Sequence, residues 1–238
     1  MNYKEFLERF VFVRKCGGCG EILSYEHARG ALCPECTRVW HIAKAENCPE
    51  CLRVVTECTC APRGLRGVRC LRKLFFYHSK KQKEPQNRML YLLKHHPNRR
   101  ISRFVASELA PALRAEISEL APCEVVLVHV PRGRRAVSKY GFDQSELVCR
   151  ALAELCGYEY LDAIGRSRGG VEQKKLKGAS RFGNVKGVFY LKKNASLSGK
   201  CVVLFDDVVT TGASMAGCVK LLKKAGAKEI LAFCIAQD

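Results

Sequence analysis

Residues 202–214 read Val-Val-Leu-Phe-Asp-Asp-Val-Val-Thr-Thr-Gly-Ala-Ser, and this stretch is the strongest indicator of the fold. Its apolar start predicts a buried strand over 201–205, and Asp206 and Asp207 follow at the carboxyl end of that strand. Adjacent carboxylates at this place suit sugar hydroxyls or a metal ion. The next residues open a helix, and their N–H groups and hydroxyls are suited to a phosphate: Thr210, Thr211, Gly212, Ala213 and Ser214. One ligand fills both halves, a ribose that carries a 5'-phosphate.

Other classes of protein share parts of this pattern. A P-loop NTPase also has an apolar strand that ends in acids, but it needs Gly-x-x-x-x-Gly-Lys-Ser/Thr elsewhere. The chain lacks that motif, and no Gly-x-Gly-x-x-Gly follows a strand to bind a dinucleotide. A surface turn that carries acids by chance is disfavoured, because each residue of the loop has a role in binding phosphate or ribose.

The length of 238 residues allows one α/β domain and a small appendage. No apolar run approaches the roughly 20 residues that a membrane span requires. The segment 1–13 contains acids and lacks a sustained apolar core, so we expect no secretory signal. These features predict a cytoplasmic protein.

Basic residues are in excess and unevenly distributed. The net charge is +18, from 41 basic and 23 acidic residues. The segment 63–103 has 13 lysines and arginines and one acid, Glu84, so it carries +12. A second segment, 166–193, has nine lysines and arginines against Glu172. Such a bias favours polyanions, either nucleic acid or a diphosphate, with a solvated basic face as the alternative.

Eight of the 15 cysteines form four close pairs: Cys16/Cys19, Cys33/Cys36, Cys48/Cys51 and Cys58/Cys60. A Cys-x2-Cys turn places two thiolates at two corners of a tetrahedral zinc site. Pairing in sequence order gives two tandem zinc ribbons, and an interleaved cross-brace would use the same ligands. We therefore expect one or two structural zinc ions. Disulfides are disfavoured because no signal peptide precedes the pairs.

The other seven cysteines are scattered, several of them within strand or helix patterns. We expect them to be reduced and to act as small apolar side chains. They are Cys70, Cys123, Cys149, Cys156, Cys201, Cys218 and Cys234.

Apolar periodicity predicts helices over 87–93, 101–117 and 142–156, and Pro111 is expected to kink or break the second. The runs 124–130 and 230–235 are apolar without alternation, which is typical of buried parallel strands. Strands that alternate with helices predict a parallel sheet with its ligand at the carboxyl ends of the strands.

Two basic segments are candidates for contact with a diphosphate. The loop after strand 124–130 offers Arg132, Gly133 and Arg134. The segment 166–184 is polar, basic and contains four glycines, so it predicts a long mobile loop whose cations could close over the ligand. A disordered loop without such a role is the alternative. The candidate cations of this loop are Arg166, Arg168, Lys174 and Lys175.

Taken in order, these motifs resemble the ComF family, phosphoribosyltransferase-like proteins often linked to competence that carry an N-terminal zinc ribbon. Stretch 202–214 alone is typical of type I phosphoribosyltransferases in general. The motifs that narrow the resemblance are Leu92-Leu93-Lys94, Val130-Pro131 with Arg134-Arg135, Gly141-Phe142-Asp143-Gln144, and Arg166, Gln173, Leu176, Arg181, Asn184-Val185 and Phe189. The family usually has arginine, asparagine and threonine where this chain has Tyr140, Asp143 and Gly170. Asp143 is therefore expected to add a negative charge close to the anion site.

The resemblance implies an α/β fold of the type I phosphoribosyltransferase kind, a parallel sheet flanked by helices, with a small N-terminal zinc-ribbon domain. The implied domains are a double zinc ribbon over 1–62 and a phosphoribosyltransferase-like domain over 63–238, of which 63–103 is a basic helical hood. The ligand implied is phosphoribosyl diphosphate (PRPP) with Mg2+. Asp206 and Asp207 would be catalytic and hold the ribose and Mg2+, residues 210–214 would hold the 5'-phosphate, and residues 132–134 would line the diphosphate.

Two functions remain open at this point. In the first, a ComF-type protein binds PRPP and Mg2+, moves phosphoribose to an amine or base, and handles single-stranded DNA during competence, with DNA-uptake proteins as partners. In the second, a non-catalytic factor uses the same fold to recognise the ribose 5'-phosphate of nucleic acid. A PRPP-sensing regulator is a third possibility, because a fold alone does not fix the chemistry.

Overall fold

The computed structural model describes residues 13–28, 30–78, 83–167, 188–193 and 195–238. A parallel sheet in the order β1-β8-β7-β3-β4 forms its centre, and β2 also pairs with β8. Its strands are β1 (Leu71–Arg72), β2 (Phe75–Phe76), β3 (Val125–His129), β4 (Glu159–Tyr160), β7 (Cys201–Val209) and β8 (Glu229–Gln237). A separate antiparallel pair consists of β5 (Ile164–Arg166) and β6 (Phe189–Leu191).

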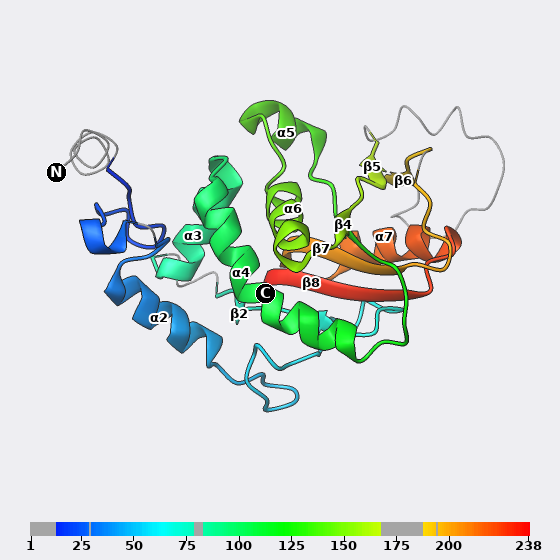
Figure 1. The fold of residues 1–238 in the computed structure, drawn as a ribbon, viewed down its shortest axis with the longest axis horizontal. Helices are drawn as coiled ribbons and strands as arrows, with labels where there is room; N and C mark the ends of the chain where they lie inside the picture. Colours follow the sequence, from blue (N-terminus) through cyan, green and yellow to red (C-terminus); the bar gives the residue numbers. More distant parts are fainter. Residues whose placement is uncertain (1–12, 29, 79–82, 168–187, 194) are drawn as a thin grey trace.

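Helices flank this sheet on both faces (Figure 1). They are α2 (Pro34–Lys44), α3 (Pro85–His95), α4 (Arg99–Ser118), α5 (Arg134–Tyr140), α6 (Gln144–Cys156) and α7 (Ala213–Lys224), with a short 3-10 turn η2 (Tyr25–His27). The sheet and its helices confirm the predicted α/β class. No helix within the described ranges is long and apolar enough to cross a membrane.

Alternation along the strands builds two cores. Val125 and Leu127 of β3 point into a core shared with α2, α3, α4 and α6, whereas Val126 and Val128 point into a core shared with α7. The side chains of neighbouring strand residues point to opposite faces, so one short apolar run fills both cores. This is why the central strands are continuous apolar stretches in the sequence.

The N-terminal region packs into the first of these cores. Trp40 of α2 is 1% exposed, and its ring lies 5.4 Å from Phe75 and 5.2 Å from Phe104. Its indole N–H donates to Glu108 of α4 at 2.8 Å, and Lys44 pairs with the same carboxylate at 2.6 Å. The buried ring with a satisfied N–H fastens the cysteine-rich region to the sheet.

Three boundaries differ from the sequence-based expectations. α4 continues through Pro111, so a break there is wrong; Leu109 and Leu113 are buried on either side and their packing holds the helix together. β7 runs on to Val209, so Asp206 and Asp207 lie within the strand and not behind it. The expected loop after β3 becomes helix α5 from Arg134 onward.

Candidate functional site

The acidic pair lies in the carboxyl-terminal half of β7, between β3 and β8. Asp206 accepts the backbone N–H of Asp207 at 2.9 Å and the hydroxyl of Ser145 at 3.4 Å. Asp207 is 8% exposed and accepts the side-chain amide of Gln144 at 2.8 Å, while the Lys94 ammonium lies 3.9 Å away. Burial, followed by the charge of Asp207, raises the pKa of Asp206 well above its usual value. A cation or hydrogen-bond donors from a ligand would stabilise the ionised pair.

A pocket of about 220 Å³ opens beside the acidic pair. Within the described part of the chain, two buried polar atoms at this pocket have no hydrogen-bond partner: the Arg132 Nη1 donor and the Gln144 Oε1 acceptor. Buried polar atoms are almost always paired, so this orphaned pair indicates a polar ligand. The lining residues are Val130, Pro131, Arg132, Gly133, Gln144, Ser145, Arg166, Asp206, Asp207, Val208 and Ser214.

A smaller cavity of about 80 Å³ lies next to it at the start of α7. Residues 208–215 line it together with Asp206. Gly212 caps the helix with a φ of +74°, a backbone conformation that glycine adopts without strain. Thr210, Thr211, Ala213 and Ser214 are exposed, so their N–H groups and hydroxyls are accessible from the cavity side. A helix N-terminus of this kind binds anions.

The cations expected near a diphosphate are only partly brought together. Arg132 and Gly133 line the larger pocket, and so does Arg166 at the end of β5. Arg166 donates to the Pro131 carbonyl at 3.4 Å. Arg134, in contrast, is an exposed residue on α5 and is not among the lining residues. Arg168, Lys174 and Lys175 lie outside the described residues.

Asp143 is buried beside the pocket, and its charge adds to the effects of burial and of the Asp207 charge that raise the pKa of Asp206. It is 8% exposed and accepts the backbone N–H groups of Arg132 at 2.6 Å, Ser145 at 2.9 Å and Glu146 at 3.4 Å. It therefore caps α6 and fixes the loop that carries Arg132. The sequence carried a signal for this role, an acid directly before a helical pattern.

His129, at the end of β3, lies close to Asp143 and to the loop that carries Arg132. It is 5% exposed, its Nδ1 lies 2.8 Å from the Tyr160 hydroxyl, and its Nε2 lies 3.7 Å from Asp143. Burial lowers the pKa of His129 although the charge of Asp143 acts in the opposite direction, so the imidazole is neutral near pH 7. Gln144, Ser145, Lys94 and His129 are the site residues that we did not expect, because distant segments bring them together.

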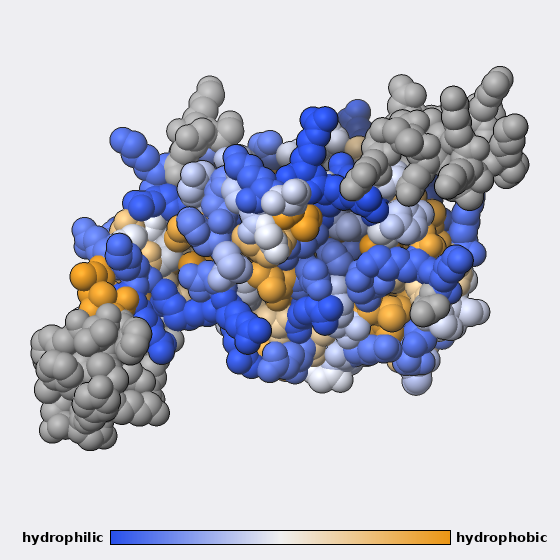
Figure 2. Space-filling model, turned by 90° about the horizontal axis from the view of Figure 1, so that it is seen from above, coloured by the Kyte–Doolittle hydropathy of each residue, from blue (hydrophilic) through white to orange (hydrophobic). Residues whose placement is uncertain are grey.

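Aromatic rings and cations form a ledge between α3 and α5, defined by Tyr91, His95, Tyr140 and Arg132. The His95 ring centre lies 4.1 Å from that of Tyr91 and 4.8 Å from that of Tyr140. The Arg132 guanidinium lies 4.7 Å from the Tyr140 ring centre, and Tyr91 is 61% exposed. The view from above in Figure 2 shows mainly hydrophilic residues with small apolar patches.

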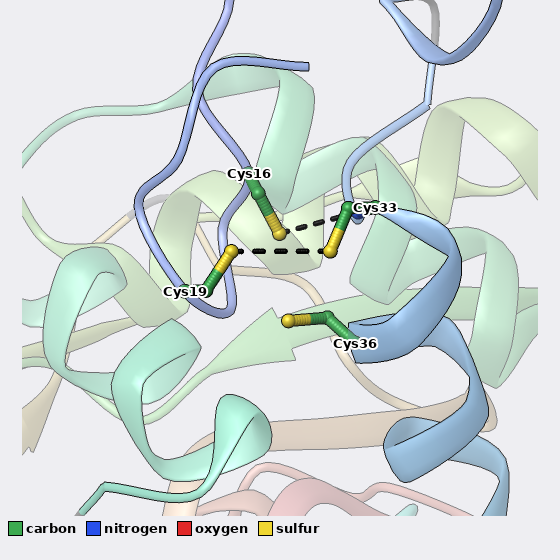
Figure 3. Close-up of side chains that lie close together, drawn as sticks. All are labelled: Cys16, Cys19, Cys33 and Cys36. Carbon is green, nitrogen blue, oxygen red and sulfur yellow. Dashed lines mark hydrogen bonds between the residues drawn. The ribbon is translucent and has the colours of Figure 1, made fainter. Parts of the chain in front are cut away.

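The eight paired cysteines form two separate groups of four, in sequence order. Within each group the sulfur atoms all lie within 4.8 Å of one another. In the first group, Cys19 Sγ lies 3.8 Å from Cys33 Sγ, and all four sulfurs converge in Figure 3. Zinc bound to thiolates at about 2.3 Å requires sulfurs roughly 3.8 Å apart, so the group fits zinc. The interleaved cross-brace is wrong. We name these groups centre 1 (Cys16, Cys19, Cys33 and Cys36) and centre 2 (Cys48, Cys51, Cys58 and Cys60).

The two centres begin with the same kind of turn, which we call a knuckle: Cys16 to Cys19 with the residues around it in centre 1, and Cys48 to Cys51 in centre 2. Cys16 N–H donates to the Glu21 carbonyl at 2.7 Å, and Cys48 N–H donates to the Arg53 carbonyl at 2.8 Å. Each knuckle ends in a residue of positive φ, Gly20 in centre 1 and Leu52 in centre 2. Isolated antiparallel bridges close both knuckles, between Lys15 and Ile22 and between Asn47 and Val54.

Thiol chemistry in the centres also suits a metal. Burial raises the pKa of Cys16 and Cys48, but backbone N–H groups that point at the sulfurs outweigh it and lower the pKa to about 7. Burial raises the pKa of Cys60 to about 12. Since metals bind the thiolate, a cation is what would deprotonate the whole set near neutral pH.

Cys123 and Cys201 form a disulfide, so our expectation of reduced side chains is wrong for these two. Pairing of β3 with β7 sets Val125 opposite Cys201 and brings the Cα atoms of the two cysteines to 6.0 Å. They are 78 residues apart in the chain, so no local pattern indicates this contact. The other five scattered cysteines are free, and four of them are buried.

Known proteins resemble about half of this chain, and a family model matches its carboxyl-terminal part. Residues 141–238 match the family model of the phosphoribosyl transferase domain. The DNA utilization protein YhgH of Escherichia coli K12 is 33% identical over 110 residues, 46% of this chain and 48% of that protein. The competence protein ComFC of Streptococcus pneumoniae R6 is 31% identical over 112 residues, 47% of this chain and 48% of that protein. This chain spans about half the length of the curated relatives that it matches.

Among solved structures, an allosteric regulatory enzyme of purine biosynthesis is 18% identical to this chain, with a TM-score of 0.40. The alignment covers 61% of this chain and 30% of the enzyme's chain. The family match, the parallel sheet with its acidic strand and the two four-cysteine centres agree with the motifs of the sequence. Over residues 141–238 the chain thus matches the phosphoribosyl transferase domain, and with its curated relatives it resembles the ComF family.

Proposed function

We propose that this chain binds PRPP together with Mg2+ at the carboxyl end of β7. The observation that carries the proposal is the juxtaposition of a carboxylate pair, a pocket with an orphaned donor and acceptor, and an anion-binding helix start. These three features match the three parts of one ligand, which are ribose, diphosphate and 5'-phosphate.

Each part of the ligand has its own set of residues in this proposal. The 5'-phosphate occupies the small cavity and accepts hydrogen bonds from residues 210–214. Asp206 and Asp207 accept hydrogen bonds from the ribose hydroxyls, and Gln144 and Ser145 hold the two carboxylates in place. Arg132 and Arg166 face the diphosphate, where Arg132 Nη1 finds its missing partner.

Transfer of phosphoribose from this arrangement needs no protein nucleophile. The C1'–O bond breaks with its electron pair on the diphosphate, positive charge develops on the ribose, and an amine or base donates a pair to C1'. Bound Mg2+ would neutralise charge on the departing diphosphate. The protein contributes orientation and electrostatic stabilisation, with the Asp206 and Asp207 carboxylates next to the developing positive charge.

The biological setting is suggested by the relatives. Proteins named for DNA utilization and for competence are 33% and 31% identical to this chain over 46% and 47% of its length. We therefore propose a role in handling DNA during its uptake, in the cytoplasm.

The ledge favours a second candidate, a non-catalytic factor that binds single-stranded nucleic acid. Bases stack on aromatic rings and cations attract the backbone, and the ledge offers both beside the acidic pair. Oligonucleotide affinity would then fall linearly with the logarithm of salt concentration and drop in a His95→Ala, Tyr140→Leu variant. An oligonucleotide affinity that the double change leaves intact would remove the ledge as its basis.

Calorimetric titration of the zinc-loaded protein with PRPP, with and without Mg2+, tests the main proposal. We expect saturable binding that requires Mg2+ and weakens at least tenfold in an Asp206→Asn, Asp207→Asn variant, since a hydrogen bond to a charged group contributes about 1.5–3 kcal/mol. Asp162→Asn is the matched control, because Asp162 is exposed, pairs with Lys192 and does not line either pocket. Equal affinity of the double variant and the wild type would refute the assignment.

A further inference from the structure

The segment that follows centre 2 packs directly on the phosphate-binding turn. A Cβ added at Gly64 would lie 2.8 Å from the Thr211 carbonyl oxygen, and one added at Gly212 would lie 2.9 Å from Leu65 Cβ. Both distances are too short for real side-chain carbons, so the two backbones lie against each other. Leu65 is 5% exposed and shares its core with Met215 and Val219 of α7. The residues 61–67, which we name the brace, therefore support the turn from behind.

The brace is fastened at its other end to centre 2. Lys73, 2% exposed, donates to the Cys60 carbonyl at 2.6 Å and to the Gln237 side chain at 2.7 Å. The same ammonium lies 5.6 Å from the Phe76 ring centre. Lys73 thus joins a centre 2 ligand to the last strand of the sheet. A buried ammonium at this place also counters the charge that four thiolates would bring.

Centre 1 has no comparable connection among the residues that the structure describes. The neighbours of Gly17 and Gly18 in its knuckle are Ile101, Met89, Pro85 and parts of centre 1 itself. These contacts lead to α3 and α4 and not to the turn at 210–214. The two centres therefore share the same knuckle but connect to different parts of the fold: centre 2 to the turn at 210–214 through the brace, and centre 1 to α3 and α4.

We propose that centre 2 positions the phosphate-binding turn, so that metal occupancy of centre 2 and the order of residues 210–214 are coupled through the brace. Coupling of this kind is reciprocal: metal at centre 2 raises affinity for an anion at the turn, and the anion raises the affinity of centre 2 for metal by the same factor. The role of the turn rests on the proposed function, whereas its contact with the brace does not.

Hydrogen exchange of the full-length, zinc-loaded protein tests the coupling without any ligand. Cys51→Ser and Cys19→Ser are matched changes, because the two cysteines occupy the same place in the two knuckles. Each is expected to lower the zinc content from two ions per chain to one. Cys51→Ser should speed exchange at least tenfold in peptides that cover 209–216, and Cys19→Ser should speed it in α3 and α4 instead. An equal effect of both changes on 209–216, or no effect of Cys51→Ser, would overturn the proposal.

A second variant tests the brace while both centres keep their zinc. Gly64→Ala forces a methyl group against the Thr211 carbonyl, whereas Gly30→Ala places one 3.3 Å from the His27 carbonyl within the centre 1 region. We expect faster exchange at 209–216 and at least tenfold weaker PRPP binding in Gly64→Ala only. Unchanged exchange in Gly64→Ala would refute the route through the brace. If PRPP fails to bind the wild type as well, the proposed function fails while the exchange result still decides the coupling.

Discussion

At the scale of single residues, the ionised form of the acidic pair is unfavourable in the free protein, and a bound ligand would stabilise it. Asp206 is half-buried and lies next to a second carboxylate, and both burial and this neighbouring charge raise its pKa. The neighbours that hold the pair, Gln144 and Ser145, satisfy only part of its hydrogen-bonding capacity. The site is thus organised for binding at some expense of stability, as is common for functional sites.

The raised pKa of Asp206 predicts how stability depends on pH. Above the unfolded value of 3.8 and up to the folded pKa, the folded state binds more protons than the unfolded state, so stability falls as pH rises through this window. Asp206→Asn removes this loss. We expect its melting temperature to exceed that of the wild type at pH 8 and the difference to shrink towards pH 4. A destabilised variant at pH 8, or a difference that ignores pH, would contradict this interpretation of Asp206.

At the scale of elements, the start of α6 organises the pocket. One carboxylate, Asp143, caps the helix and holds the Arg132 backbone. Its two neighbours in sequence, Gln144 and Ser145, then face the acidic pair of β7. The loop after β3 and the helix α6 are in this way locked together, and the pocket lies between them and β7.

Replacement of Asp143 tests this arrangement. Asp143→Ala is expected to lower the free energy of unfolding by about 1–2 kcal/mol through the lost cap, and to weaken PRPP binding because Arg132 loses its anchor. Asp143→Asn keeps one acceptor oxygen for the cap but loses the acceptor for the Arg132 N–H, so its stability should fall less than that of Asp143→Ala. Urea unfolding of both variants measures this. A loss in Asp143→Asn as large as in Asp143→Ala would show that the cap at Ser145 and Glu146 does not carry the stability.

Local patterns were enough to predict much of the fold. Apolar runs marked β3, β7 and β8, and spacing marked the eight metal-ligand candidates, because both depend on near neighbours in the chain. Contacts between distant segments were not predictable in this way. The Cys123–Cys201 disulfide arises from strand pairing, and the hydrogen bond from the Arg132 N–H to Asp143 joins the loop after β3 to the start of α6. A break of the helix at Pro111 was a wrong prediction, because burial of Leu109 and Leu113 on both sides outweighs the local preference of proline.

At the scale of the whole molecule, the cysteine-rich region and the sheet share one core through Trp40. The division into residues 1–62 and 63–238 stays a prediction, but the packing shows that the two parts contact each other closely. Loss of metal should therefore loosen the packing of the sheet as well as that of the two centres.

Trp40 is the one tryptophan of the chain and reports on this contact. Removal of zinc with a strong chelator is expected to shift its emission to longer wavelength, because a ring that is 1% exposed would meet water. Renewed addition of zinc should reverse the shift. Emission that stays unchanged after complete zinc removal would show that the core around Trp40 does not depend on the centres.

A crystal structure of the zinc-loaded protein with PRPP and Mg2+ would locate the ligand directly. We predict the 5'-phosphate at residues 210–214, the ribose hydroxyls at Asp206 and Asp207, and the diphosphate beside Arg132 and Arg166. PRPP bound elsewhere, or a pocket without PRPP at a saturating concentration, would contradict the proposed site.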